Sequence, residues 1–240
     1  MSTIEHRFLD ALGETRGVEA ADRLCQTCVE LIDVDVDVDA AALSLVFDGA
    51  NIGTVGASDA QARVYDEMQF VVGEGPCLDS VAHRAPVLVA DLADATEQRW
   101  PAYGPMMIAH EIRGVCAIPV VVAGEYVGAL DLFRIAPGDP SREQLAGMMV
   151  AAELAQLPLL DLLSDDLQAG FSDPGSNAWE DLNALSRSEV GQATGMLMAQ
   201  LGLNATSALA RLRAYAYASG RSATSVARDI IDRRLWLEAD

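Results

Sequence analysis

The 240-residue sequence lacks several features that would place it in a specialised class of protein. It has no run of about 18 apolar residues, the length that a membrane-spanning helix requires. Its first 17 residues are charged throughout and contain no apolar secretory segment, so we expect a cytoplasmic protein without a membrane anchor. Four cysteines in a long chain that is 51% hydrophobic indicate a packed core and argue against a disulfide scaffold.

The sequence also has no lysine, so its 16 basic side chains are all arginine, against 36 acids. The net charge of −20 argues against broad affinity for nucleic acid. The charge is unevenly divided. Residues 1–184 carry 31 acids and 9 arginines, a net of −22, whereas residues 185–240 carry 5 acids and 7 arginines, a net of +2. This break predicts two modules with different partners, and an acidic module that can dock on the basic one.

No carboxylate lies between Glu189 and Asp229. Arginine and tyrosine occupy this segment instead, a combination that phosphate groups and splayed RNA bases favour. The helical pattern that opens the segment contains Gly191 and Gly195, each of which costs a helix about 1 kcal/mol relative to alanine. Either the two glycines let RNA approach the backbone closely, or they let helices pack together.

The first 163 residues have the pattern of an α+β module. β-branched runs predict strands over residues 42–47, 52–55 and 85–92 and a hairpin over residues 114–134. Apolar residues recur every three or four positions over residues 3–32 and 141–163, which indicates helices. Helices before, between and after antiparallel strands predict a sheet covered by helices.

The last 56 residues have the pattern of three helices. Residues 164–184 are polar, contain glycine and proline, and are predicted to be a linker. Gly202 and Gly220 are expected to end the first two helices. The expected caps of the second and third helices are Asn204 and either Ser222 or Thr224. So small a bundle has a thin core, and we expect it to depend on a partner for stability.

The segment GEGPC, residues 73–77, combines two glycines with a proline suited to a first helical turn. Cys77 would then lie at a helix N-terminus, where the helix dipole lowers a thiol pKa. Cys77 is therefore a candidate ligand contact or redox residue, and the alternative is a passively buried thiol. Cys25 and Cys28 have metal-site spacing but no second pair, so we interpret them as packing residues and predict no metal site. No nucleophile, base and oxyanion donors come together in the pattern, and no enzyme is predicted.

Residues 18–163 resemble a GAF domain in the series VGEGPCLDSVAHRAPVLVADL and RWPAYGPMMIAHEIRGVCAIPVVVAGEYVGALDLF. The resemblance implies a six-stranded antiparallel sheet with helices on both faces. It also implies a pocket on one face that often holds a small molecule. Neither that ligand nor any cofactor can be named from the sequence.

The C-terminal series RSEVGQATGMLMAQLGLNATSALARLRAYAYASGRSATSVARDII resembles an ANTAR domain along its whole length. ANTAR domains bind paired stem-loops in nascent messenger RNA and prevent transcription termination. The resemblance implies a signal-responsive RNA-binding regulator, and a homodimer because two stem-loops need two reading heads. Thr194 stands where the family commonly has a lysine, so one phosphate-contacting cation is missing.

The sequence thus predicts a GAF-like sensory domain at residues 1–163, a linker at 164–184 and an ANTAR three-helix bundle at 185–240. The candidate RNA-binding residues are Arg187, Gln192, Thr194, Gly195, Arg211, Arg213, Tyr217 and Arg221. One alternative is a DNA-binding regulator that uses the three helices as a helix-turn-helix, although no helix carries the side chains that read base edges. The other is a cysteine-dependent reductase with a GAF fold.

Overall fold

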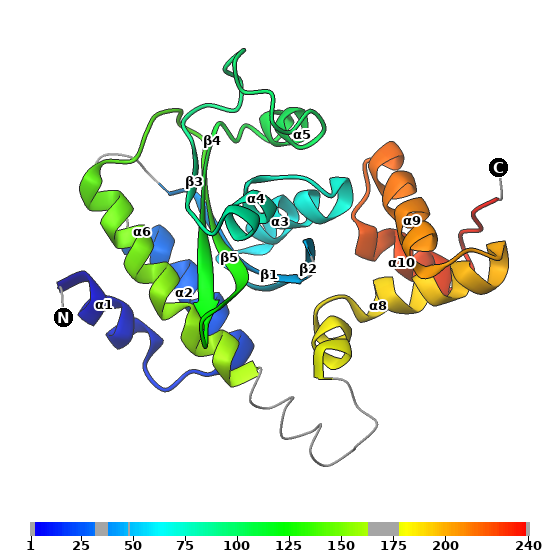
Figure 1. The fold of residues 1–240 in the computed structure, drawn as a ribbon, viewed down its shortest axis with the longest axis horizontal. Helices are drawn as coiled ribbons and strands as arrows, with labels where there is room; N and C mark the ends of the chain where they lie inside the picture. The colour runs from blue at the N-terminus through cyan, green and yellow to red at the C-terminus, as the bar shows by residue number, and fades with distance from the viewer. Residues whose placement is uncertain (1–2, 32–37, 48, 163–177, 239–240) are drawn as a thin grey trace.

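The computed structural model describes residues 3–31, 38–47, 49–162 and 178–238, and of residues 3, 47 and 178–188 it describes the backbone alone. These residues form two units. Residues 3–162, the sheet module, place helices on both faces of one sheet, and residues 178–238, the bundle, are helical (Figure 1). Both predicted units are therefore present.

The sheet has five antiparallel strands in the order β2-β1-β5-β4-β3. The strands are β1 (Ala40–Phe47), β2 (Ala50–Ala57), β3 (Val87–Val89), β4 (Gly114–Val122) and β5 (Glu125–Arg134). The β4–β5 hairpin turns at Ala123 and Gly124, whose φ angles of 52° and 89° are those of a tight two-residue turn. The family resemblance implies six strands, and the described part of the chain contains five.

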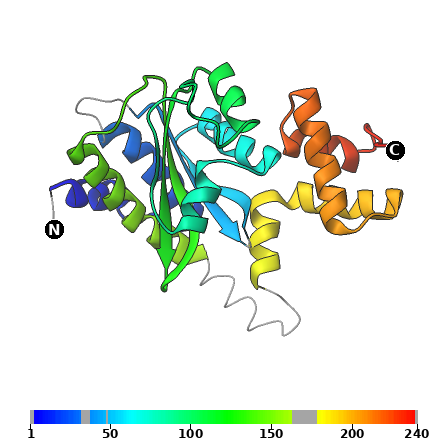
Figure 2. The ribbon, with the colours of Figure 1, turned by 45° about the horizontal axis from the view of Figure 1, so that its top comes forward.

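Helices cover both faces of the sheet (Figures 1 and 2). One face is covered by α1 (Thr3–Leu12), α2 (Gly17–Leu31) and α6 (Arg142–Leu154), and the other by α3 (Ala60–Val72), α4 (Pro76–His83) and α5 (Tyr103–Ala109). Successive strand residues face opposite sides. In β5 this puts Leu130 and Leu132 against the first group of helices and Phe133 against the second.

The bundle consists of α8 (Ala178–Leu201), α9 (Ala205–Ser219) and α10 (Ala223–Ile231). Its expected caps are confirmed. Asn204 accepts a hydrogen bond from the Ser207 amide, and Ser222 does the same at α10. Gly202 and Gly220 are left-handed, with φ of 66° and 62°. Helix α8 begins at Ala178, inside the segment predicted to be a linker, and residues 164–177 of that segment lie outside the described part.

Among the described residues, the helical stretch 142–162 is long and apolar enough to cross a membrane by length and composition. The sequence predicts no such stretch. The residues of α6 that face the sheet, Met148, Ala151 and Leu154, are buried in the core as in a soluble packing helix. The opposite side exposes Met149, Leu157 and Leu160.

Helix α2 crosses β2 at Gly56, where a Cβ atom would lie 2.4 Å from the backbone carbonyl carbon of Ala21. We expect Gly56→Ala to lower the free energy of unfolding by about 1–3 kcal/mol, the usual cost of overpacking. Gly104→Ala is the matched control, because a Cβ there meets nothing within 4 Å. Urea unfolding of both variants measures the effect. Equal stability of Gly56→Ala and the wild type would contradict this close contact.

Candidate nucleic-acid interface

The acid-free segment forms a groove of about 630 Å³ between α8 and α9. Gly191, Thr194, Gly195 and Met198 are three or four residues apart and therefore share one face of α8. Arg213 lines the groove from α9. Three of the predicted RNA-binding residues, Thr194, Gly195 and Arg213, thus come together.

The two glycines keep this face of α8 open. A Cβ at Gly191 or Gly195 would meet nothing within 4 Å among the described residues. The helix contacts of α8 are made by other residues, including the fully buried Ala193 and Leu197. Helix packing therefore does not require the glycines, and that alternative is wrong. Thr194 donates its hydroxyl back to the Val190 carbonyl oxygen at 2.7 Å, so its side chain stays close to the helix.

The other predicted RNA-binding residues lie elsewhere. Arg211 is about 200° around the helix from Arg213 and donates to the Glu238 carbonyl oxygen. Gln192 is exposed outside the residues that line the groove. Arg221 donates to Asp229 Oδ2 at 2.5 Å and to the Ser225 hydroxyl. The side chain of Arg187 lies outside the described part of the chain. The predicted set is therefore not one continuous face.

The wall of the groove opposite α8 belongs to the sheet module. Ile52 of β2 and Phe70 of α3 line it, and the Arg213 guanidinium carbon is 4.2 Å from the centroid of the Phe70 ring. A guanidinium at this distance makes a cation–π interaction. Phe70 and Val71 also belong to the same buried cluster as the bundle core. The bundle therefore packs part of its core against the sheet module, and its dependence on this contact for stability stays a prediction.

Glu67 makes a second contact between the modules. Its carboxylate accepts hydrogen bonds from the Thr224 amide nitrogen at 3.2 Å and the Thr224 hydroxyl at 3.3 Å. Thr224 lies in the first turn of α10, where amide groups have no partner within the helix and carry partial positive charge. An acid of the sheet module thus caps a helix of the bundle.

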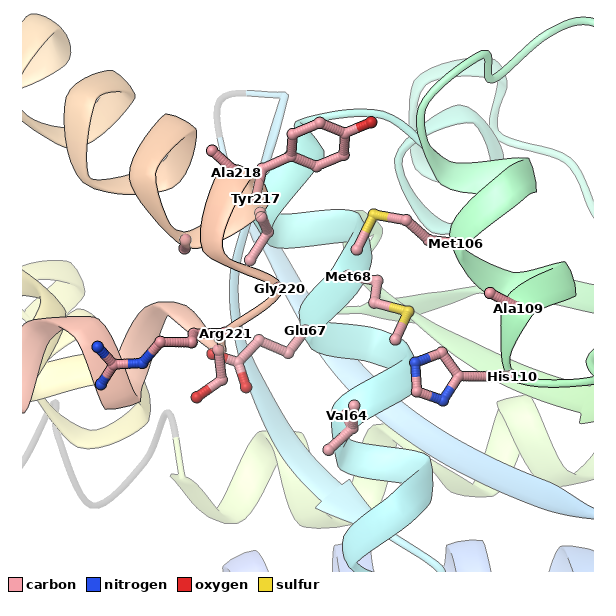
Figure 3. Close-up of a pocket in the computed structure, with 13 residues that line it drawn as sticks. Val64, Glu67, Met68, Met106, Ala109, His110, Tyr217, Ala218, Gly220 and Arg221 are labelled. Carbon is pink, nitrogen blue, oxygen red and sulfur yellow. The ribbon is translucent and has the colours of Figure 1, made fainter.

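A second pocket, of about 540 Å³, lies beside this contact (Figure 3). Met68, Met106 and His110 line it from the sheet module, and Tyr217 and the turn at Gly220 line it from the bundle. Tyr217 is 51% exposed, so its ring remains accessible. Figure 3 shows the Arg221 guanidinium pointing away from the sheet-module wall of the pocket.

Cys77 is the second residue of α4, directly after Pro76, as predicted, and is fully buried. Its backbone amide donates to Gln69 Oε1 at 2.8 Å. Gly75 is required here, because its φ is 148° and a Cβ would lie 2.4 Å from that same oxygen. Burial, followed by the charges of Asp131 and Asp66, raises the pKa of the Cys77 thiol. The lowering expected from the helix dipole is therefore outweighed.

Two buried aspartates beside Cys77 were not among the residues expected from the sequence. Asp66 accepts hydrogen bonds from Asn51 Nδ2 at 2.9 Å and from the hydroxyls of Ser44 and Thr54. Asp131 accepts from Gln69 Nε2 at 2.7 Å. The available signal for Asp131 was its place in the apolar strand GALDLF, where a carboxylate at a core position is unusual.

Asp229 supports a pH-dependent prediction for the bundle. Arg221, and then Arg234, lower the pKa of this carboxyl through hydrogen bonds. A lowered folded-state pKa adds stability above the unfolded-state pKa, and that stability is lost as pH falls through the folded-state value. We expect Asp229→Asn to melt at a lower temperature than the wild type at neutral pH, and the difference to close in acid.

Thermal melts of full-length protein from neutral to acidic pH test this prediction. Glu153→Gln, on an exposed position of α6, is the control for a carboxylate outside the bundle. If the difference in melting temperature between Asp229→Asn and the wild type stayed constant with pH, the ion pairs of Asp229 would not stabilise the bundle.

Family models of two domains match the chain: the GAF domain over residues 18–156 and the ANTAR domain over residues 183–231. The structure is similar to the GAF domain of a phosphoenolpyruvate-protein phosphotransferase from Coxiella burnetii, with 16% identity, a TM-score of 0.51, and 70% of this chain and 95% of that chain covered. A GAF domain of the corresponding Acinetobacter protein has 10% identity, a TM-score of 0.48, and 65% and 92% coverage. A type II free methionine-R-sulfoxide reductase from Thermoplasma acidophilum has 15% identity, a TM-score of 0.44, and 65% and 93% coverage. None of the curated proteins compared with the chain matches it.

Proposed function

Because the chain belongs to the GAF family and carries an ANTAR domain after its sheet module, we propose that it is a signal-responsive regulator that binds stem-loops in nascent messenger RNA and prevents transcription termination. The observation that carries the proposal is the groove between α8 and α9. It is free of carboxylates, has an open glycine face on one side, and contains Arg213 on the other. Phosphate groups and bases fit such a surface.

The proposal includes a restrained resting state. Phe70 lies against Arg213, and Glu67 caps α10, so the sheet module occupies one wall of the groove. RNA that binds at this wall must displace the sheet module. Its apparent affinity is therefore the affinity of the open state multiplied by the fraction of molecules that are open. A small molecule that favours the open state would then increase RNA binding.

The proposal also includes a homodimer in the cytoplasm. Met149, Leu157 and Leu160 are between 43% and 48% exposed on the outer side of the last sheet-module helices. Exposed apolar side chains gathered on one helical stretch support contact with a second copy. Such a contact would bring two bundles together for two stem-loops.

An enzymatic role has less support. All four cysteines, Cys25, Cys28, Cys77 and Cys116, are buried in the structure. Reactive cysteines are usually partly exposed and have lowered pKa values, whereas burial raises the pKa of Cys28 and Cys116. The proposal therefore assigns no reaction to the chain.

We expect Phe70→Ala to increase the affinity of full-length protein for a hexaloop RNA hairpin. The substitution removes the ring beneath Arg213 and so favours the open state. An interaction of about 0.5–2 kcal/mol corresponds to about a 2- to 30-fold gain. Fluorescence anisotropy at fixed salt measures it, with duplex DNA of equal length as competitor.

Tyr126→Ala is the matched control, because it removes a ring from beneath Arg84 outside the groove. It should leave RNA affinity unchanged. Preference for duplex DNA would favour the helix-turn-helix alternative. An RNA affinity of Phe70→Ala equal to that of the wild type would show that the sheet module does not restrain binding.

Gly195→Ala separates helix stability from RNA binding. Alanine should stabilise α8 by about 0.5–1 kcal/mol, because nothing blocks its Cβ. We expect the same change to weaken RNA binding in the Phe70→Ala background, because a methyl group then stands in the groove. Ala199→Gly, exposed on the same helix, should lose stability and keep its affinity. Tighter RNA binding by Gly195→Ala would rule out the glycine face as the contact.

A further inference from the structure

Three side chains that can bind a metal meet inside the sheet module. They are Asp66 of α3, Cys77 of α4 and Asp131 of β5. The cysteine sulfur and one carboxylate oxygen of each aspartate lie within 4.8 Å of one another. All three residues have no exposed surface. In a tetrahedral site, metal–sulfur and metal–oxygen distances of about 2.3 and 2.1 Å place ligand atoms about 3.5 Å apart. The three side chains are therefore within roughly 1 Å of binding geometry.

Two further buried atoms point to a ligand at this place. Asp131 Oδ1 and the Tyr103 hydroxyl have no hydrogen-bond partner among the residues that the structure describes. Tyr103 is fully buried, and the charges of Asp131, Asp66 and Cys77 act on it. Buried polar atoms are nearly always paired. A cation held by Asp66, Cys77 and Asp131 would satisfy the Asp131 oxygen that has no partner among the described residues.

We propose that Asp66, Cys77 and Asp131 form a binding site for one divalent transition-metal ion. One thiolate and two carboxylates are a mixed soft and hard donor set, which suits first-row ions such as Zn²⁺ or Co²⁺. Ca²⁺ and Mg²⁺ prefer sites made of oxygen alone. The sequence predicts no metal site, because the three residues are far apart in the chain.

Surrounding side chains hold the ligands in place. Ser44, Asn51 and Thr54 donate to Asp66. Gln69 holds two ligands at once, because its Nε2 donates to Asp131 and its Oε1 accepts from the Cys77 amide. Such outer hydrogen bonds orient ligands and tune metal sites.

Metal binding at this site is coupled to proton release. Burial raises the pKa values of the Cys77 thiol and the Asp131 carboxyl. A metal ion binds the thiolate and the carboxylates, so its binding releases the protons that these groups carry and strengthens as pH rises.

Full-length protein stripped with a chelator and titrated with Co²⁺ tests the proposal. We expect one equivalent to bind with a thiolate-to-cobalt charge-transfer band, and Zn²⁺ to displace the cobalt and remove the band. Cys77→Ser should lose the band. Cys28→Ser is the matched control, because it removes a buried thiol of the CxxC pair and should keep the band. A band that survives in Cys77→Ser, or no band in the wild type, would overturn the proposal.

Asp131→Asn provides a second readout if Cys77→Ser does not fold. The amide has nearly the same shape as the carboxyl group and cannot ionise in the buried site, so this variant should fold and be at least as stable as the wild type in EDTA. With Zn²⁺ the order should reverse, because a ligand that binds the native state alone stabilises it in proportion to ln(1 + [L]/Kd). A Zn²⁺ shift of the melting temperature that is equal in both proteins would also overturn the site. Neither experiment involves RNA, so its outcome is independent of the proposed function.

Discussion

Helix α3 packs on both of its sides, and this double packing connects the two modules. Asp66 and Gln69 turn towards the sheet and hold the polar groups around Cys77. Glu67 and Phe70 turn towards the bundle and contact α10 and Arg213. Because a helix is a rigid element, a displacement of α3 on one side must be accommodated on the other.

The bundle has a small core of its own, and its contact with the sheet module extends that core. Most of its buried residues are alanine or aliphatic. Among the buried residues described in this cluster, the one aromatic ring is Phe70, which belongs to the sheet module. Separation of the bundle from the sheet module therefore exposes apolar surface on both modules. Contact with RNA or with another surface must offset the free energy lost by this exposure. Under the proposed function, RNA and the sheet module compete for Arg213.

Local signals in the sequence predicted most helices and strands. They could not predict contacts between residues that are far apart in the chain. Asn204 and Gly202 define helix ends through neighbouring atoms only, so their roles could be read from the sequence. The ring beneath Arg213 comes from a residue far earlier in the chain. Residues 178–184 were assigned to the linker because they directly follow a polar segment that contains glycine and proline.

Under the proposed function, the groove binds RNA without the lysine that the ANTAR family commonly has, and the open face of α8 is the reason. Thr194 bonds to its own helix and adds no charge, and the two glycines add no side chain. Among the described residues, the cation that lines the groove is Arg213, on the opposite helix. The planar guanidinium of arginine can stack on a ring and can bind a phosphate through two parallel hydrogen bonds, whereas the ammonium group of lysine has no planar face. The same side chain can therefore lie on Phe70 in the docked state and on a phosphate or a base in the open one.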